Sequence, residues 1–105
     1  MILLRFDMRA PVLGPPAKSP STQDLYATAL EMAAWGEEHG AIQIVISEHH
    51  GSEDGYLPSP LVFAAAVAGR TKSVPIQIGA LIVPLPAPLR LAEDMAVVDL
   101  TSGGR

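Results

Sequence analysis

The sequence has no cysteine, few aromatic residues and few charged ones. Of its 105 residues, 5% are aromatic and 17% are charged, against 49% that are hydrophobic. The absence of cysteine excludes a disulfide scaffold and a zinc site built on thiolates. A chain with so much apolar surface and so little charge must bury that surface, which excludes an intrinsically disordered protein.

Strong positive charge and long apolar runs are also missing. The chain has 7 Lys and Arg against 11 Asp and Glu, a formal net charge of -4. This balance argues against a nucleic-acid-binding surface, which needs basic clusters to neutralise phosphates. No run approaches the roughly 18 apolar residues of a membrane-spanning helix, and no secretory signal is evident. We therefore expect a cytoplasmic protein that binds neither nucleic acid nor membranes.

What the sequence does contain is a regular alternation of strand-like and helix-like segments. Hydrophobic periodicity predicts strands at about residues 2–6, 41–47 and 74–83, and helices at about residues 22–39, 60–72 and 88–100. Ser21 or Thr22 is expected to cap the first helix, with Asp24 completing a capping box. Ser59, followed by Pro60, is expected to cap the second helix.

This order of elements predicts a single partial α/β domain over residues 1–105. Strands joined by helices run parallel, so the order fits either an open doubly wound sheet or part of a (β/α)8 barrel. Three eighths of a typical barrel of about 250 residues is about 94 residues, close to this chain's length. Residues 6–11 also lack the glycine fingerprint of dinucleotide-binding folds. We predict the N-terminal three βα units of a TIM-type barrel, with the barrel incomplete in this chain.

The residues after the second predicted strand are the main candidates for chemistry. Ser47, Glu48, His49 and His50 stand at the carboxyl end of that strand, where parallel α/β folds build their active sites. Strand alternation places His49 on the side of Ser47, toward the barrel mouth, and directs Glu48 and His50 away. The same alternation predicts a helix-facing row of isoleucines at positions 42, 44 and 46.

Two other interpretations of this tripeptide stay open. A Glu-His-His sequence can simply be the solvated start of a loop. Because neighbouring side chains on a strand point in opposite directions, His49 and His50 alone make a poor chelate. Glu48, Glu53 or Asp54 would be needed to complete a metal site, and we assign no metal ligand.

With these residues the sequence resembles the bacterial luciferase-like flavin-dependent oxidoreductase family. The shared features follow the family's order over essentially the whole chain: Ser47-Glu48-His49-His50, Pro58-Ser59-Pro60, residues 78–84, Ala87-Pro88-Leu89-Arg90, and Ala92-Glu93-Asp94 through residues 99–105. The resemblance implies a (β/α)8 barrel that binds FMN, or the deazaflavin F420, at its carboxyl mouth. It also implies either monooxygenation of a small organic substrate with reduced flavin and O₂, or hydride exchange with F420.

The resemblance further implies roles for individual residues. His49 matches the family's pocket histidine and is the predicted catalytic residue, as a hydrogen-bond donor or proton carrier. Gly79 and Ala80 match the segment in which the family often has a non-proline cis peptide behind the flavin ring, so both are predicted to contact the cofactor. Asp7 is a further cofactor-binding candidate because it ends the first predicted strand.

The chain ends where the family's fourth strand is expected to begin. The family's flavin-phosphate contacts come mostly from later strands and loops. We therefore expect the 105-residue chain alone to be inactive and to bind flavin weakly.

Two alternatives to a flavin oxidoreductase remain. The first is a non-catalytic half-barrel that self-associates, because an unfilled barrel interior would expose Leu3, Val45, Leu81 and Val83 at a loss of several kcal/mol. This argument predicts a homo-oligomer unless a C-terminal part completes the barrel. The second is a metal-dependent hydrolase that uses the two histidines and acidic loop residues.

Overall fold

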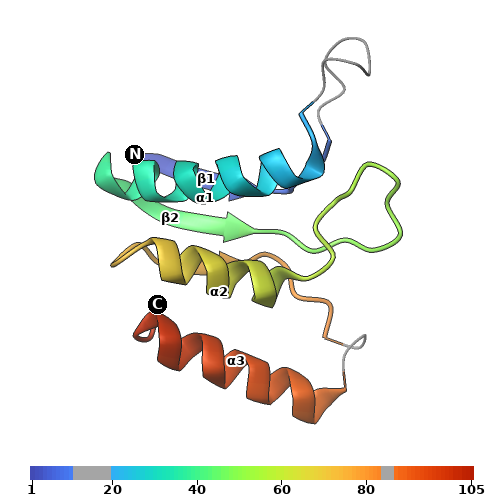
Figure 1. The fold of residues 1–105 in the computed structure, drawn as a ribbon. Helices are drawn as coiled ribbons and strands as arrows, with labels where there is room; N and C mark the ends of the chain where they lie inside the picture. Colours follow the sequence, from blue (N-terminus) through green and yellow to red (C-terminus); the bar gives the residue numbers. More distant parts are fainter. Residues whose placement is uncertain (11–19, 84–86) are drawn as a thin grey trace.

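Strands and helices alternate through the part of the chain that the computed structural model describes, which is residues 1–10, 20–83 and 87–105. Pro84 of the family-like motif lies outside these residues. The elements follow one another as β1 (Ile2–Phe6), α1 (Thr22–Glu38), β2 (Ala41–Ile46), α2 (Pro60–Arg70), β3 (Ile76–Ile78) and α3 (Pro88–Ser102) (Figure 1).

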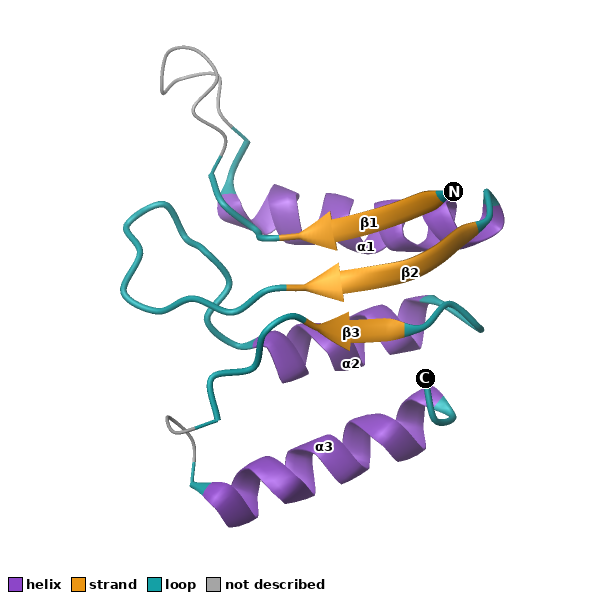
Figure 2. Cartoon of the chain, turned by 180° about the vertical axis from the view of Figure 1, so that it is seen from behind, coloured by secondary structure: helices purple, strands orange, loops and turns teal. Residues whose placement is uncertain are grey.

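The three strands form one parallel sheet in the order β1-β2-β3. The helices α1 and α2 lie on one face of this sheet, while α3 lies beside β3 and packs against α2 (Figure 2). The predicted fold class is therefore confirmed as three parallel βα units that form an open sheet. None of the helices in the described ranges is long and apolar enough to cross a membrane.

The third strand is much shorter than the predicted 74–83, because it covers only Ile76–Ile78. A strand extends only as far as a neighbour can hydrogen-bond to it. The neighbour β2 ends at Ile46, whose carbonyl accepts the Gly79 N–H at 2.8 Å, and residues 79–80 then form a turn. The apolar segment that follows has strand-like composition but no strand to pair with among the described residues.

The hydrophobic core lies between the sheet and the two helices that cover it. Ile44 and Ile46 are fully buried and pack in one cluster with side chains of α1 and α2. Phe63 of α2 meets the ring of Phe6 edge to face, with centroids 5.9 Å apart. Ile42 was expected in the same row but is 51% exposed. The ladder shifts register opposite Ile42, and such an irregularity interrupts the alternation of side chains.

Local chemistry defines the beginning of each covering helix. Ser21 caps α1, with its hydroxyl accepting the Asp24 N–H at 3.1 Å and the Asp24 carboxylate accepting the Ser21 N–H at 3.2 Å. The predicted capping box is therefore confirmed. Ser59 precedes α2 but makes no capping bond through its side chain, so there the fixed backbone of Pro60 favours the start of the helix.

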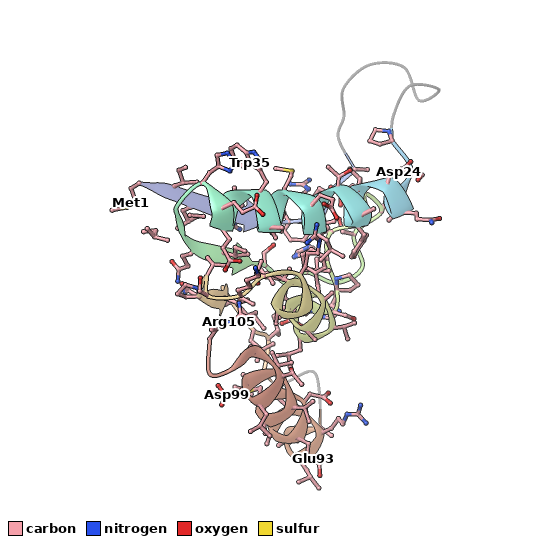
Figure 3. All side chains as sticks on the ribbon, turned by 60° about the vertical axis from the view of Figure 1, so that its left-hand side comes forward. Met1, Asp24, Trp35, Glu93, Asp99 and Arg105 are labelled. Atoms are coloured by element: carbon pink, nitrogen blue, oxygen red, sulfur yellow. The ribbon has the colours of Figure 1, made fainter. Side chains whose placement is uncertain are left out.

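Two charged side chains hold the connection between α2 and β3. The Glu37 carboxylate, near the end of α1, accepts the N–H groups of Lys72, Ser73 and Val74 at 2.6 to 2.8 Å. Burial acts to raise the pKa of Glu37, but these backbone bonds and the Ser73 hydroxyl outweigh it and lower the pKa to about 2. From the opposite side, the Arg105 guanidinium donates to the carbonyls of α2 and its connection, including that of Ala68 at 3.0 Å (Figure 3).

The face of the sheet opposite α1 and α2 is only partly covered. On this face Leu3 is 50% exposed and Val45 is half-buried. Val83, in the segment after β3, is 53% exposed, whereas Leu81 is half-buried and lines a hollow with side chains of α2 and α3, so it does not face the barrel interior as predicted. Apolar surface of this kind is what the predicted self-association would cover.

Candidate functional site

The carboxyl ends of all three strands point to one edge of the sheet, from which the loops after β2 and β3 extend (Figure 1). The candidate residues Asp7, His49, Gly79 and Ala80 all lie in segments that follow these strands. Because parallel strands bring their carboxyl ends together, the topology alone places the candidates at one mouth.

Asp7 lies just after β1 and belongs to a tight polar group. Its Oδ1 accepts the Ser47 hydroxyl at 2.6 Å and the Arg5 Nε–H at 2.8 Å. Burial acts to raise the pKa of Asp7, but the bonds from Ser47 and Arg5 outweigh it and leave that pKa below its usual value. Asp7 is therefore a fixed negative charge that joins the ends of β1 and β2.

The loops after β1 and β2 are joined through their main chains. The carbonyl of Asp7 accepts the Leu57 N–H at 3.1 Å, and the carbonyl of Leu57 in turn accepts the His49 N–H at 3.0 Å. A second link pairs the Arg9 Nε–H with the Asp54 carboxylate at 2.6 Å. These bonds set the backbone of the loop that carries His49.

The His49 side chain is exposed and lies against Tyr56, with ring centroids 5.0 Å apart and the rings tilted by 48°. The guanidinium carbon of Arg9 lies 5.3 Å from the centroid of the same Tyr56 ring. Tyr56 therefore contacts both a cation and the predicted catalytic histidine. Sequence reasoning missed Tyr56, although an aromatic residue in the loop after a buried strand could have marked it.

Glu48 and His50 lie on the helix side of the sheet's edge, as strand alternation predicted, because residues of α2 and α3 line the same hollow. The Glu48 side chain is only 5% exposed, one carboxylate oxygen lies 2.7 Å from His50 Nε2, and the other accepts the Ile82 N–H. His50 and Glu48 line a hollow of about 300 Å³ together with apolar side chains that include Leu81 and Leu91.

The peptide bond between Gly79 and Ala80 is cis, which confirms the sequence-based prediction of a non-proline cis peptide there. Gly79 is half-buried, and a Cβ at this position would lie 3.4 Å from Val45 Cγ1. Ala80 is exposed on the side of the mouth. The segment thus exposes the small side chain of Ala80 and is joined to the loop after β2 through the Glu48–Ile82 contact.

The two histidines do not form a joint ligand set, since His49 lies by Tyr56 and His50 binds Glu48. Within residues 1–10, 20–83 and 87–105, no group of three or more His, Cys, Asp or Glu is placed to hold a metal ion. The geometry therefore gives no support to the metal-dependent hydrolase alternative.

Comparison with known proteins decides the family. The model of the luciferase-like monooxygenase family matches residues 6–105. The chain belongs to this family. The alkanal monooxygenase alpha chain of Photorhabdus laumondii subsp. laumondii is 32% identical over 85 residues, which are 81% of this chain and 24% of that protein. The oxygenase component of the flavin-dependent trigonelline monooxygenase of Acinetobacter baylyi is 30% identical over 83 residues, which are 79% of this chain and 23% of that protein.

Solved structures of similar proteins share the fold. Monooxygenase RslO1 from Streptomyces bottropensis superposes with a TM-score of 0.83 at 31% identity, over 100% of this chain and 31% of its own. The oxygenating constituent of 3,6-diketocamphane monooxygenase from Pseudomonas putida, solved in complex with FMN, superposes with a TM-score of 0.79 at 23% identity, over 96% of this chain and 26% of its own. The chain thus spans about a quarter of the length of the curated relatives it matches.

Proposed function

We propose that this chain contributes the first three βα units and the ring-facing wall of the pocket in an FMN-dependent monooxygenase that acts on a small organic substrate. The observation that carries the proposal is that exposed His49 and the Gly79–Ala80 segment lie at the same edge of the sheet. FMN is favoured over F420 because one relative is named flavin-dependent and one structural neighbour is an FMN complex.

The residues at the mouth fit the ring of a flavin. Gly79 and exposed Ala80 have no bulky side chain, which leaves room for a planar tricyclic ring to pack against them. His49 supplies a polar group at the mouth that can donate a hydrogen bond or carry a proton near neutral pH. When bound, the flavin supplies the redox chemistry with O₂, and the protein supplies orientation and exclusion of water.

The same mouth fits the phosphate of FMN poorly. Its two arginines are both engaged, Arg5 with Asp7 at 2.8 Å and Arg9 with Asp54 at 2.6 Å. An anion needs cations or main-chain N–H groups that are not already neutralised by carboxylates. We therefore propose that the phosphate is held by the part of the barrel that the relatives have and the described residues lack.

A chimera tests this function. The chain replaces the segment of RslO1 that it superposes on, and FMN binding is followed by flavin fluorescence in the chimera and in the chain alone. We expect micromolar binding by the chimera and at least tenfold weaker binding by the chain alone, because the phosphate contacts are missing there. A folded chimera that does not bind FMN would contradict the proposal.

A second candidate function is a half-barrel that assembles with a second copy of itself. Its support is the half-exposed Leu3 on the open face of the sheet and the half-exposed Val83 in the segment after β3. Sedimentation at micromolar concentration tests it, and a stable monomer there would contradict self-association.

A further inference from the structure

A buried carboxylate joins the loop after β2 to the segment after β3, and the function proposed above gives it no direct contact with the flavin. The Glu48 side chain is 5% exposed, and a buried charge is unfavourable unless its oxygens are bonded. Here both oxygens have donors, since one lies 2.7 Å from His50 Nε2 and the other accepts the Ile82 N–H. The two donors come from different segments, the loop after β2 and the segment after β3.

These two contacts restrain the orientation of both partners, which the attraction between two charges alone would not do. A carboxylate can only accept hydrogen bonds, so the contact with His50 requires a proton on Nε2 and a defined ring orientation. The bond to Ile82 is equally directional, because a main-chain N–H has a single proton to donate. One buried side chain therefore sets both the His50 ring and the main chain three residues after Gly79.

We propose that Glu48 is a positioning residue that holds the His50 ring and the main chain at Ile82 in one fixed arrangement. Its importance for the flavin rests on the proposed function, in which residues 79–80 form the wall behind the ring. By linking that wall to the loop that carries both histidines, Glu48 sets the pocket before the cofactor binds. Hydrogen bonds from such supporting residues hold the groups that contact a ligand in position before the ligand binds.

The test compares three variants of the chain by NMR in the absence of flavin. Glu48→Met removes both acceptor oxygens but keeps an unbranched buried side chain. Glu48→Gln is the milder variant, since it keeps one acceptor oxygen for the two donors, and it is used if Glu48→Met does not fold. Glu53→Met is the matched control, because Glu53 is an exposed glutamate of the same loop.

Two local signals report the two contacts. In the wild-type chain, a hydrogen-bonded Nε2 proton of His50 is expected as a resolved downfield resonance. In Glu48→Met this resonance should broaden through exchange with water, and the Ile82 amide should exchange about tenfold faster, as expected when a bond to a charged acceptor is lost. The His39 ring, whose Nδ1 lies 2.7 Å from the Trp35 carbonyl oxygen, should be unchanged and serves as an internal reference.

An unchanged His50 resonance together with Ile82 exchange within twofold of wild type would overturn the proposal, as would an equal response in Glu53→Met. In Glu48→Gln, loss of either the ring signal or the protection of Ile82 supports it, and retention of both overturns it. Failure of the chimera to bind FMN would contradict the proposed function alone, since the NMR measurements contain no flavin.

Discussion

The two ends of the sheet use their charged side chains differently. At the amino end of β3, Glu37 accepts three main-chain N–H groups and Arg105 donates to main-chain carbonyls. At the carboxyl ends of the strands, charges mainly bind other side chains, as Asp7 binds Arg5 and Asp54 binds Arg9. At the amino end, the side chains of Glu37 and Arg105 bind main-chain groups that have no partner in a helix or strand. At the carboxyl ends, the paired side chains remain polar groups that a ligand can approach.

This difference indicates which end maintains the fold and which end is available for function. Val74 is buried, so its N–H would lose its acceptor at a cost of desolvation, whereas exposed ion pairs contribute little net stability. In barrels of this architecture the carboxyl end carries the active site and the amino end carries stability. The described residues of this chain follow the same division, although they include only three strands.

The largest loss of stability is expected from removing the Glu37 carboxylate at the amino end of β3. Glu37→Ala leaves the N–H groups of residues 72–74 without their acceptor and should lower the free energy of unfolding by about 2–3 kcal/mol. Urea denaturation followed by circular dichroism measures this loss. The neighbouring Glu38 is exposed, so Glu38→Ala is the control and should stay within about 0.5 kcal/mol of wild type. Equal losses in both variants would show that the helix end, and not the carboxylate, matters.

The lowered pKa of the Glu37 carboxylate predicts that stability depends on pH. The pKa of Glu37 is about 2 in the folded chain against its ordinary value of 4.5, so the unfolded chain binds a proton first as the pH falls. The contribution of Glu37 is therefore fully present above about pH 4.5 and is lost progressively down to pH 2. After allowance for partial solvent screening, about 2 kcal/mol should disappear over this window.

Glu37→Gln is the matched variant for this pH effect. Because its amide does not titrate in this range, its denaturation midpoint should change less between pH 5 and pH 2 than that of wild type. Parallel pH profiles for the two proteins would contradict the role assigned to Glu37.

The sequence predicted the regular parts of this fold because they follow local rules. The order of elements, the capping box at Ser21 and the buried isoleucines of β2 all come from spacing along the chain. The sequence did not predict where β3 ends, because the length of β3 depends on how far β2 extends as its hydrogen-bonding partner. The composition of residues 74–83 does not show how far β2 extends beside them.

The candidate site was predictable in part for the same reason. The position of His49 and the cis peptide at Gly79–Ala80 came from a motif whose residues lie close together in sequence. The contact of Glu48 with Ile82 spans 34 residues, so no local pattern could reveal it. Tyr56 was missed because its position beside His49 depends on how the loop folds back.

A smaller loss of stability is expected from changing the Asp7 carboxylate at the carboxyl end of the sheet. Asp7→Asn keeps an oxygen that can accept the Ser47 hydroxyl and loses the charge that attracts Arg5. The free energy of unfolding should fall by less than about 1 kcal/mol, since this pair is partly exposed and screened. A loss as large as that of Glu37→Ala, measured by the same urea denaturation, would remove the distinction between the two ends.

The smallest effect on stability, and the largest on function, is expected at His49. Its side chain is exposed and lies against one face of Tyr56, so His49→Ala should change the free energy of unfolding by no more than about 0.5 kcal/mol. In the chimera that tests the proposed function, the same substitution should leave FMN binding within a few-fold and lower turnover by about 100-fold, the lower range for loss of a general acid or base. His39→Ala is the control, because His39 lies at the C-terminal end of α1, remote from the mouth. Turnover that is unchanged at saturating flavin and substrate would remove His49 from the mechanism, and a large loss of stability would make it a structural residue like Glu37.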